Sequence, residues 1–141
     1  MEIAFEDVLV IENFRKKSID NEDLGPTELI PRVKANIIFE KKKYRGDIRL
    51  KGDRLAHFEE KKKSSYKIEL DRNKYLFGLK KFSIQKPRLR NYIHEWLFHE
   101  MAKDFNIIKI KYDFVNLSIN GENLGLYVIE EGFGKELIER N

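Results

Sequence analysis

The sequence predicts an α+β fold, a mostly antiparallel sheet with one main helix packed on it. Several short segments alternate apolar and polar residues and are separated by turn residues, which is typical of strands. One long stretch after Pro87 repeats its apolar residues at helical spacing. With 141 residues the chain is long enough to bury a usable core, so we expect a single domain over residues 1–141.

The N-terminal third predicts one helix and one strand pair. Apolar residues recur at helical spacing over 5–19, which favours a helix there. Residues 18–31 contain Asp, Asn, Gly and two prolines and are expected to form a connecting loop. The segments 33–40 and 44–51 flank the charged run E-K-K-K, which is typical of a hairpin turn between two strands.

The remaining elements follow from the same patterns. Residues 52–64 are polar and basic and are expected to form a loop. The segments 65–71 and 80–85 are expected to be further strands of a core that spans 33–131. Pro87 is well placed to open a helix that reaches about Phe105. The segments 112–119 and 124–130 flank N-G-E-N, where Asn-Gly predicts a hairpin. Residues 134–140 are expected to start another helix, in a segment over 134–141 that the end of the chain cuts off.

Composition excludes several classes of protein. There is no cysteine, which excludes disulfide frameworks and thiolate zinc sites. No apolar run approaches the roughly 20 residues of a membrane span, and the first residues lack the pattern of a signal peptide. The three histidines are not spaced with acids as metal ligands, so no metal site is expected.

Two strands predict a basic sheet face. In the segments 44–51 and 65–71 the apolar residues share one side, and Arg49, Lys51 and Lys67 share the other. This face is either an ordinary solvated surface or a cradle for phosphate. Gly52 and Asp53 follow directly, and a glycine lets the backbone approach a phosphate closely.

The helix after Pro87 carries two acidic candidates. Glu100 falls within the apolar stripe of the helical wheel, where a carboxylate is costly to bury without a cation, and Lys67 is a natural partner. Protein kinases pair a strand lysine with a helix glutamate in this way. Glu100 could instead turn to solvent near the end of the helix. Glu95 lies on the opposite face of the wheel and is the second candidate.

Five motifs in the second half of the chain resemble a known family. They are I-R-L-K-G-D (48–53), S-Y-K-I-E-L (65–70), F-G-L-K-K-F-S-I-Q (77–85), R-N-Y-I-H-E-W-L-F-H-E-M (90–101) and N-G-E-N-L-G-L-Y-V-I-E-E (120–131). In this order and spacing they closely resemble the front half of the CotH kinase family, the atypical protein kinases similar to spore coat protein H. The resemblance covers roughly Val33 to Asn141.

The resemblance implies the nucleotide-binding N-lobe of a kinase that phosphorylates Ser or Thr in proteins, including spore coat proteins, with ATP and Mg²⁺. By position, Lys67 would be the strand lysine and Glu95 the helix acid. The residues expected near the phosphates are Lys51, Gly52 and Asp53, with Arg49 on the same face. The hinge against adenine would be formed by Val128, Ile129, Glu130 and Glu131.

The same resemblance implies that the catalytic acids, the base and the Mg²⁺ ligands lie beyond Asn141, so no catalytic residue or metal ligand is expected in this chain. Phe133, Leu137 and Ile138 would then face a C-lobe, which would also carry the protein substrate, and their exposure predicts self-association. The location would be cytoplasmic or spore-associated. Alternatives are a non-catalytic scaffold that binds a protein, and a basic nucleic-acid-binding module, which a net charge of only +4 disfavours.

Overall fold

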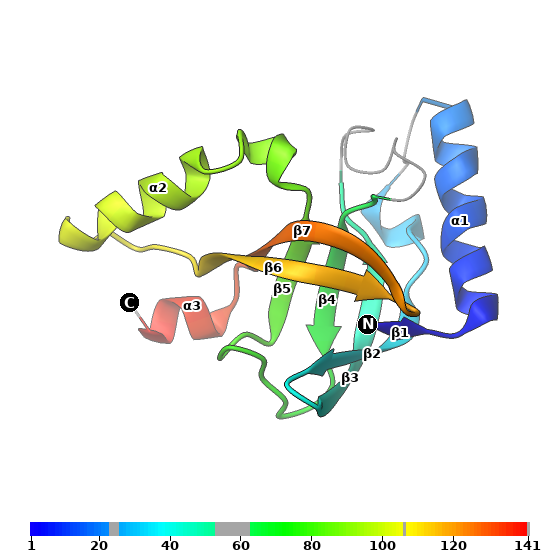
Figure 1. Ribbon diagram of the computed structural model, residues 1–141, viewed down its shortest axis with the longest axis horizontal. Helices are drawn as coiled ribbons and strands as arrows, with labels where there is room; N and C mark the ends of the chain where they lie inside the picture. Colours follow the sequence, from blue (N-terminus) through cyan, green and yellow to red (C-terminus); the bar gives the residue numbers. More distant parts are fainter. Residues whose placement is uncertain (23–25, 53–62, 106, 141) are drawn as a thin grey trace.

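Seven antiparallel strands form one sheet in the computed structural model, which describes residues 1–22, 26–52, 63–105 and 107–140. The order across the sheet is β1-β2-β3-β4-β5-β7-β6 (Figure 1). The strands are β1 Glu2–Ile3, β2 Val33–Phe39, β3 Lys42–Leu50, β4 Tyr66–Leu70, β5 Lys81–Gln85, β6 Tyr112–Ile119 and β7 Glu122–Glu131. The helices are α1 Phe5–Asp20, α2 His94–Met101 and α3 Lys135–Arg140, with short 3-10 turns η1 Thr27–Leu29, η3 Pro87–Arg90 and η4 Ala102–Asp104. None of the described helices is long and apolar enough to cross a membrane.

The sheet curls so that its two ends approach each other. Figure 1 shows the β6–β7 hairpin crossing in front of β4 and β5, with the N-terminus beside its turn. The backbone N–H of Ile3 donates to Asn120 Oδ1 at 2.8 Å, and the Asn120 N–H donates to the Met1 carbonyl at 2.9 Å. Asn120 and Gly121 have φ values of 49° and 85°, so the predicted Asn-Gly hairpin is confirmed. The short strand β1 was not predicted.

The two faces of β3 and β4 are as the alternation predicts. The strands pair with Ile48 opposite Ile68 and Arg49 opposite Lys67. Ile48 and Ile68 are buried in the core, which lies on the inner face of the curl. Ile11 of α1 joins the same core, so α1 is a helix that packs on the sheet. The expected helix at 5–19 is confirmed as α1, with one more residue at its C-terminal end.

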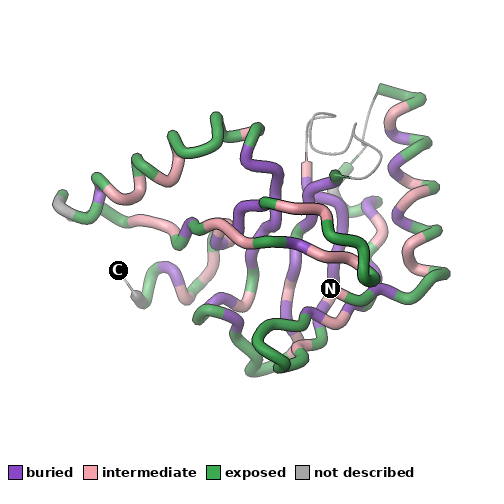
Figure 2. The backbone as a smooth tube through the Cα atoms, viewed as in Figure 1, coloured by how far each residue is buried: buried purple, intermediate pink, exposed green. Residues whose placement is uncertain are grey.

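The long helix predicted from Pro87 to Phe105 is wrong. The chain forms η3 and then places Asn91 and Tyr92 in the left-handed region, with φ values of 49° and 58°. An asparagine in that conformation ends a helix, so α2 begins only at His94. No residue of α2 is buried, and Leu97 and Met101 of the predicted apolar stripe are 46% and 59% exposed. Figures 1 and 2 show α2 projecting away from the sheet it was expected to cover.

Candidate functional site

Polar side chains line up in rows across the outer face of the sheet. The strand register places Arg49 opposite Lys67, Lys67 opposite Ser83, and Ser83 opposite Glu130. The neighbouring row contains Asp47, Glu69 and Lys81. Because directly paired residues point to the same face, these rows form one surface opposite the core. The predicted basic face therefore exists, but acidic residues are interleaved with the basic ones.

A cavity of about 350 Å³ lies on this face. Its polar lining combines four cations with two carboxylates, and the chain leaving β7 supplies one wall. The main lining residues are Arg32, Asp47, Arg49, Lys67, Glu69, Lys81, Ser83, Gly132 and Phe133. Phe133 is 87% exposed and provides an aromatic ring at the rim of the cavity. The cavity thus offers excess positive charge beside an aromatic surface.

Both carboxylates of the cavity are already paired. Lys34 Nζ lies 3.0 Å from Asp47, and Lys81 Nζ lies 3.1 Å from Glu69. Arg49 is buried, and its Nη1 donates to the Leu50 carbonyl at 3.3 Å. Burial lowers the pKa of Arg49, and the charge of Arg32 lowers it further. Since burial and a like charge both disfavour the Arg49 cation, an anion in the cavity would stabilise it.

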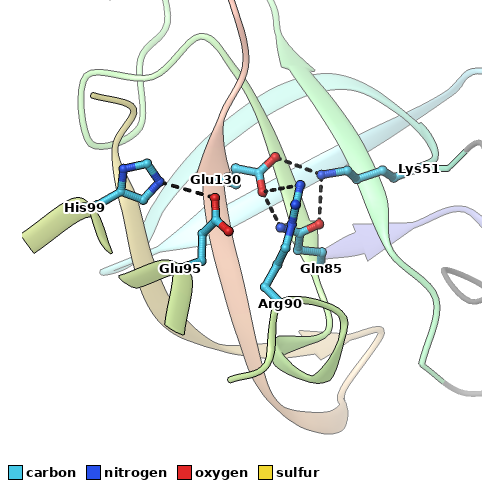
Figure 3. A network of polar contacts seen from close by, with 6 residues as sticks. All are labelled: Lys51, Gln85, Arg90, Glu95, His99 and Glu130. Carbon is cyan, nitrogen blue, oxygen red and sulfur yellow. Dashed lines mark hydrogen bonds and ion pairs between the residues drawn. The ribbon is translucent and has the colours of Figure 1, made fainter. Parts of the chain in front are cut away.

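Lys51 forms a separate cluster with residues of β5 and β7 (Figure 3). Its Nζ lies 2.9 Å from Glu130 Oε1 and 2.8 Å from Gln85 Oε1, and Gln85 Nε2 donates to Glu130 Oε2. Arg90 Nη2 lies 3.7 Å from Glu130 Oε2. The fully buried Ser65, directly before β4, accepts a backbone hydrogen bond of 2.8 Å from the Lys51 N–H.

This cluster changes the expected roles of two residues. Lys51 was expected near phosphates and Glu130 against adenine, whereas the structure pairs their side chains with each other. Sequence reasoning missed Gln85 and Arg90. Alternation along β5 would have placed Gln85 on the same face as Ser83 and Lys81, and that signal was present in the sequence. Gly52 follows Lys51 with a φ of 136°, and Asp53 lies outside the described residues.

The segment expected to be the hinge lies inside the sheet. Val128, Ile129, Glu130 and Glu131 all belong to β7, which is paired with β5 on one side and β6 on the other. Glu131 Oε2 also accepts a hydrogen bond of 2.8 Å from the Lys111 backbone N–H. Backbone groups of these residues therefore face neighbouring strands and not a ligand. Gly132 and Phe133, where the chain leaves the sheet, reach the cavity in their place.

The expected pairing of Lys67 with a helix acid is not formed. Glu100 instead pairs with Lys103 in the next turn, and Glu95 Oε1 lies 3.6 Å from His99 Nε2. Within the described residues no ion pair joins Lys67 to either acid. The physical reason is the interrupted helix, which carries both acids away from the centre of the sheet. Figure 3 shows Glu95 beside the Glu130–Arg90 end of the cluster.

We expect two tyrosines to ionise late. Burial raises the pKa of Tyr112 to about 12, with Glu130 adding to the shift, and burial together with Glu12 raises the pKa of Tyr66 to about 12. Their stabilising contribution is complete below about pH 10 and is lost as the pH rises towards 12. A titration followed by tyrosinate absorbance should show a late phase that shrinks in Tyr66→Phe and Tyr112→Phe. An unchanged late phase in both variants would contradict this prediction.

The comparisons with known proteins identify the family. A family model described as CotH kinase protein matches residues 43–141, which is more than half of the chain. The chain belongs to the CotH kinase family. A search of curated proteins finds no match. The match begins at Lys43, later than the Val33 expected from the motifs, and covers β3 to α3. In this CotH-family chain, most of the cavity lining and the whole Lys51 cluster lie within the matched residues.

Proposed function

We propose that this chain is the nucleotide-binding N-lobe portion of a CotH-family kinase that phosphorylates Ser or Thr in proteins with ATP. The observation that carries the proposal is the cavity on the outer face of the sheet, where Arg49 and Lys67 meet the segment that leaves β7. Cations offset phosphate charge, and an aromatic ring can stack on a base. The family match over residues 43–141, which contains Arg49, Lys67 and Phe133, supports the proposal with a kinase-like fold.

In this proposal Arg49 and Lys67 bind the phosphates of ATP, and Phe133 contacts the adenine. The Lys51 cluster joins the end of β3 to β5 and β7 and makes no contact with ATP in this proposal. Among the described residues no group of three His, Asp or Glu side chains could hold a metal ion. Mg²⁺ would offset the phosphate charge when bound. The acids that bind it, and the base that orients the acceptor hydroxyl, would come from outside these 141 residues.

We expect affinity to rise with the number of phosphates. Titration of the chain with a fluorescent ATP analogue, followed by competition, should rank ATP above ADP and ADP above AMP, because each added phosphate gains contact with the cations. Adenosine should compete weakly. Equal competition by adenosine and ATP would contradict a phosphate-binding role for the cavity, and the absence of saturable binding would contradict the proposal itself.

We further propose that Phe133 and Ile138 form the surface on which a C-lobe docks. They are 87% and 73% exposed, whereas Leu137, expected at the same surface, is buried and belongs to the packing of α3. The free chain should therefore self-associate at high concentration. Sedimentation velocity should show a concentration-dependent shift that Ile138→Ser reduces. A strictly monomeric wild-type chain would remove the support for this surface.

A further inference from the structure

The strand β6 has one unpaired edge beside an unassigned groove. It is the last strand of the sheet, and within the described part of the chain β7 is the strand that pairs with it. A groove of about 670 Å³ runs along this edge and touches every residue from Lys109 to Asn116. The rest of the lining comes from Phe39, Phe77, Leu79 and Ile129, and from His99, Glu100 and Lys103 of α2 and η4. The groove thus lies between β6 and residues at the end of β2 and before β5.

Asn116, near the middle of this edge, directs its backbone groups away from β7. The Phe114 N–H donates to Asp113 Oδ1 at 2.8 Å, and the Ser118 carbonyl accepts from the Met1 amino group at 2.7 Å, so even-numbered residues face outward. The Lys111 carbonyl accepts from the Glu131 N–H at 2.9 Å, so odd-numbered residues face β7. Alternation then directs the N–H and C=O of the exposed Asn116 to the open edge.

The lining of the groove includes two aromatic side chains from outside β6, alongside its polar residues. Phe39 and Phe77 contact each other edge to face with ring centroids 4.7 Å apart, and both are exposed. Val115 and Phe114 of β6 are only half-buried, and Ile129 forms part of the groove lining. The outward backbone groups of Asn116 and the exposed aromatic side chains of the groove are the two parts that strand addition requires.

We propose that the β6 edge binds an extended segment of a partner protein, which adds to the sheet as a further strand and inserts a large apolar side chain into the groove. An extended chain fits because its own N–H and C=O groups match the spacing of those at Asn116. An aromatic or leucine side chain fits because Phe39, Phe77 and Val115 line the space it would enter. The proposal goes beyond nucleotide binding and does not depend on it.

A peptide-display library of about ten random residues tests the proposal on the 141-residue chain. Asn116→Pro is the decisive variant, because proline removes the outward N–H while the bonds from β6 to β7 remain. Asn116→Ala is the matched control, and Phe39→Ser tests the aromatic lining of the groove. Thermal unfolding of each variant confirms that it is folded before binding is compared.

Selected peptides should alternate apolar and polar residues and bind wild type and Asn116→Ala within about twofold of each other. Asn116→Pro, Phe39→Ser and methylation of the central peptide nitrogen should each weaken binding roughly tenfold. The proposal is overturned if no selected peptide distinguishes wild type from Asn116→Pro. It is also overturned if Asn116→Pro abolishes a dimer of this chain, because a second copy would then occupy the edge.

Discussion

Replacing Glu130 with glutamine should lower the free energy of unfolding by about 3 kcal/mol. Glu130 pairs with Lys51 at 2.9 Å, and the two side chains are only 14% and 11% exposed. Glutamine keeps the shape of the side chain but removes its charge, so the Lys51 ammonium stays nearly buried with Gln85 as its main acceptor. An uncompensated cation in such a place is more costly than the pair is stabilising. Urea denaturation of both proteins measures the difference.

The control for this prediction is an ion pair of similar length at the surface. Lys135 and Glu139 lie 2.9 Å apart with side chains that are 83% and 60% exposed. Glu139→Gln should therefore change the free energy of unfolding by less than about 0.5 kcal/mol. The double variant Lys51→Met with Glu130→Gln should lose less than the sum of the two single variants. Similar losses for Glu130→Gln and Glu139→Gln would show that burial does not strengthen the Lys51 pair.

Local patterns in the sequence predicted most of the sheet. The alternation of apolar and polar residues correctly predicted the two faces of β3 and β4, and Asn-Gly at 120–121 correctly predicted the last hairpin. Both features depend only on residues that are neighbours in the sequence. The interruption at Asn91 and Tyr92 was missed because the apolar spacing continues through it. The helical wheel was therefore drawn for one continuous helix packed on the sheet. The predicted ion pair between Glu100 and Lys67 depended on that packing.

The partner of Lys51 could not be read from periodicity. Its contacts with Gln85 and Glu130 join the end of β3 to β5 and β7, so they depend on the register of three strand pairs. The pairing of the expected hinge residues within the sheet was not foreseen for a related reason. The acidic end of β7 is contiguous in sequence with the segment that leaves the sheet, but only the pairing of β7 with β5 and β6 shows where the backbone becomes free.

Removing the two cavity cations should separate nucleotide binding from stability. Arg49→Gln and Lys67→Met should each weaken ATP binding roughly tenfold, and the double variant by roughly a hundredfold, because each removes a charge-assisted contact with phosphate. Their unfolding free energies should stay within about 1 kcal/mol of wild type, because neither side chain belongs to the Lys51 cluster. Isothermal titration calorimetry and urea denaturation of the same samples measure both quantities.

Variants of two other lysines, Lys43 in β3 and Lys51 directly after it, test whether the effect on ATP binding is specific to the cavity. Lys43 lies on the same strand, outside the cavity, and pairs with Glu2 at 3.0 Å, so Lys43→Met should leave ATP affinity unchanged. Lys51→Met should destabilise the fold and affect ATP binding only where unfolding reduces the folded fraction. If Lys51→Met abolished binding in a folded protein while Lys67→Met did not, the phosphates would have to lie at the Glu130 end of the sheet. The cluster would then open to admit them, since Lys51 cannot bind phosphate and Glu130 with the same hydrogens.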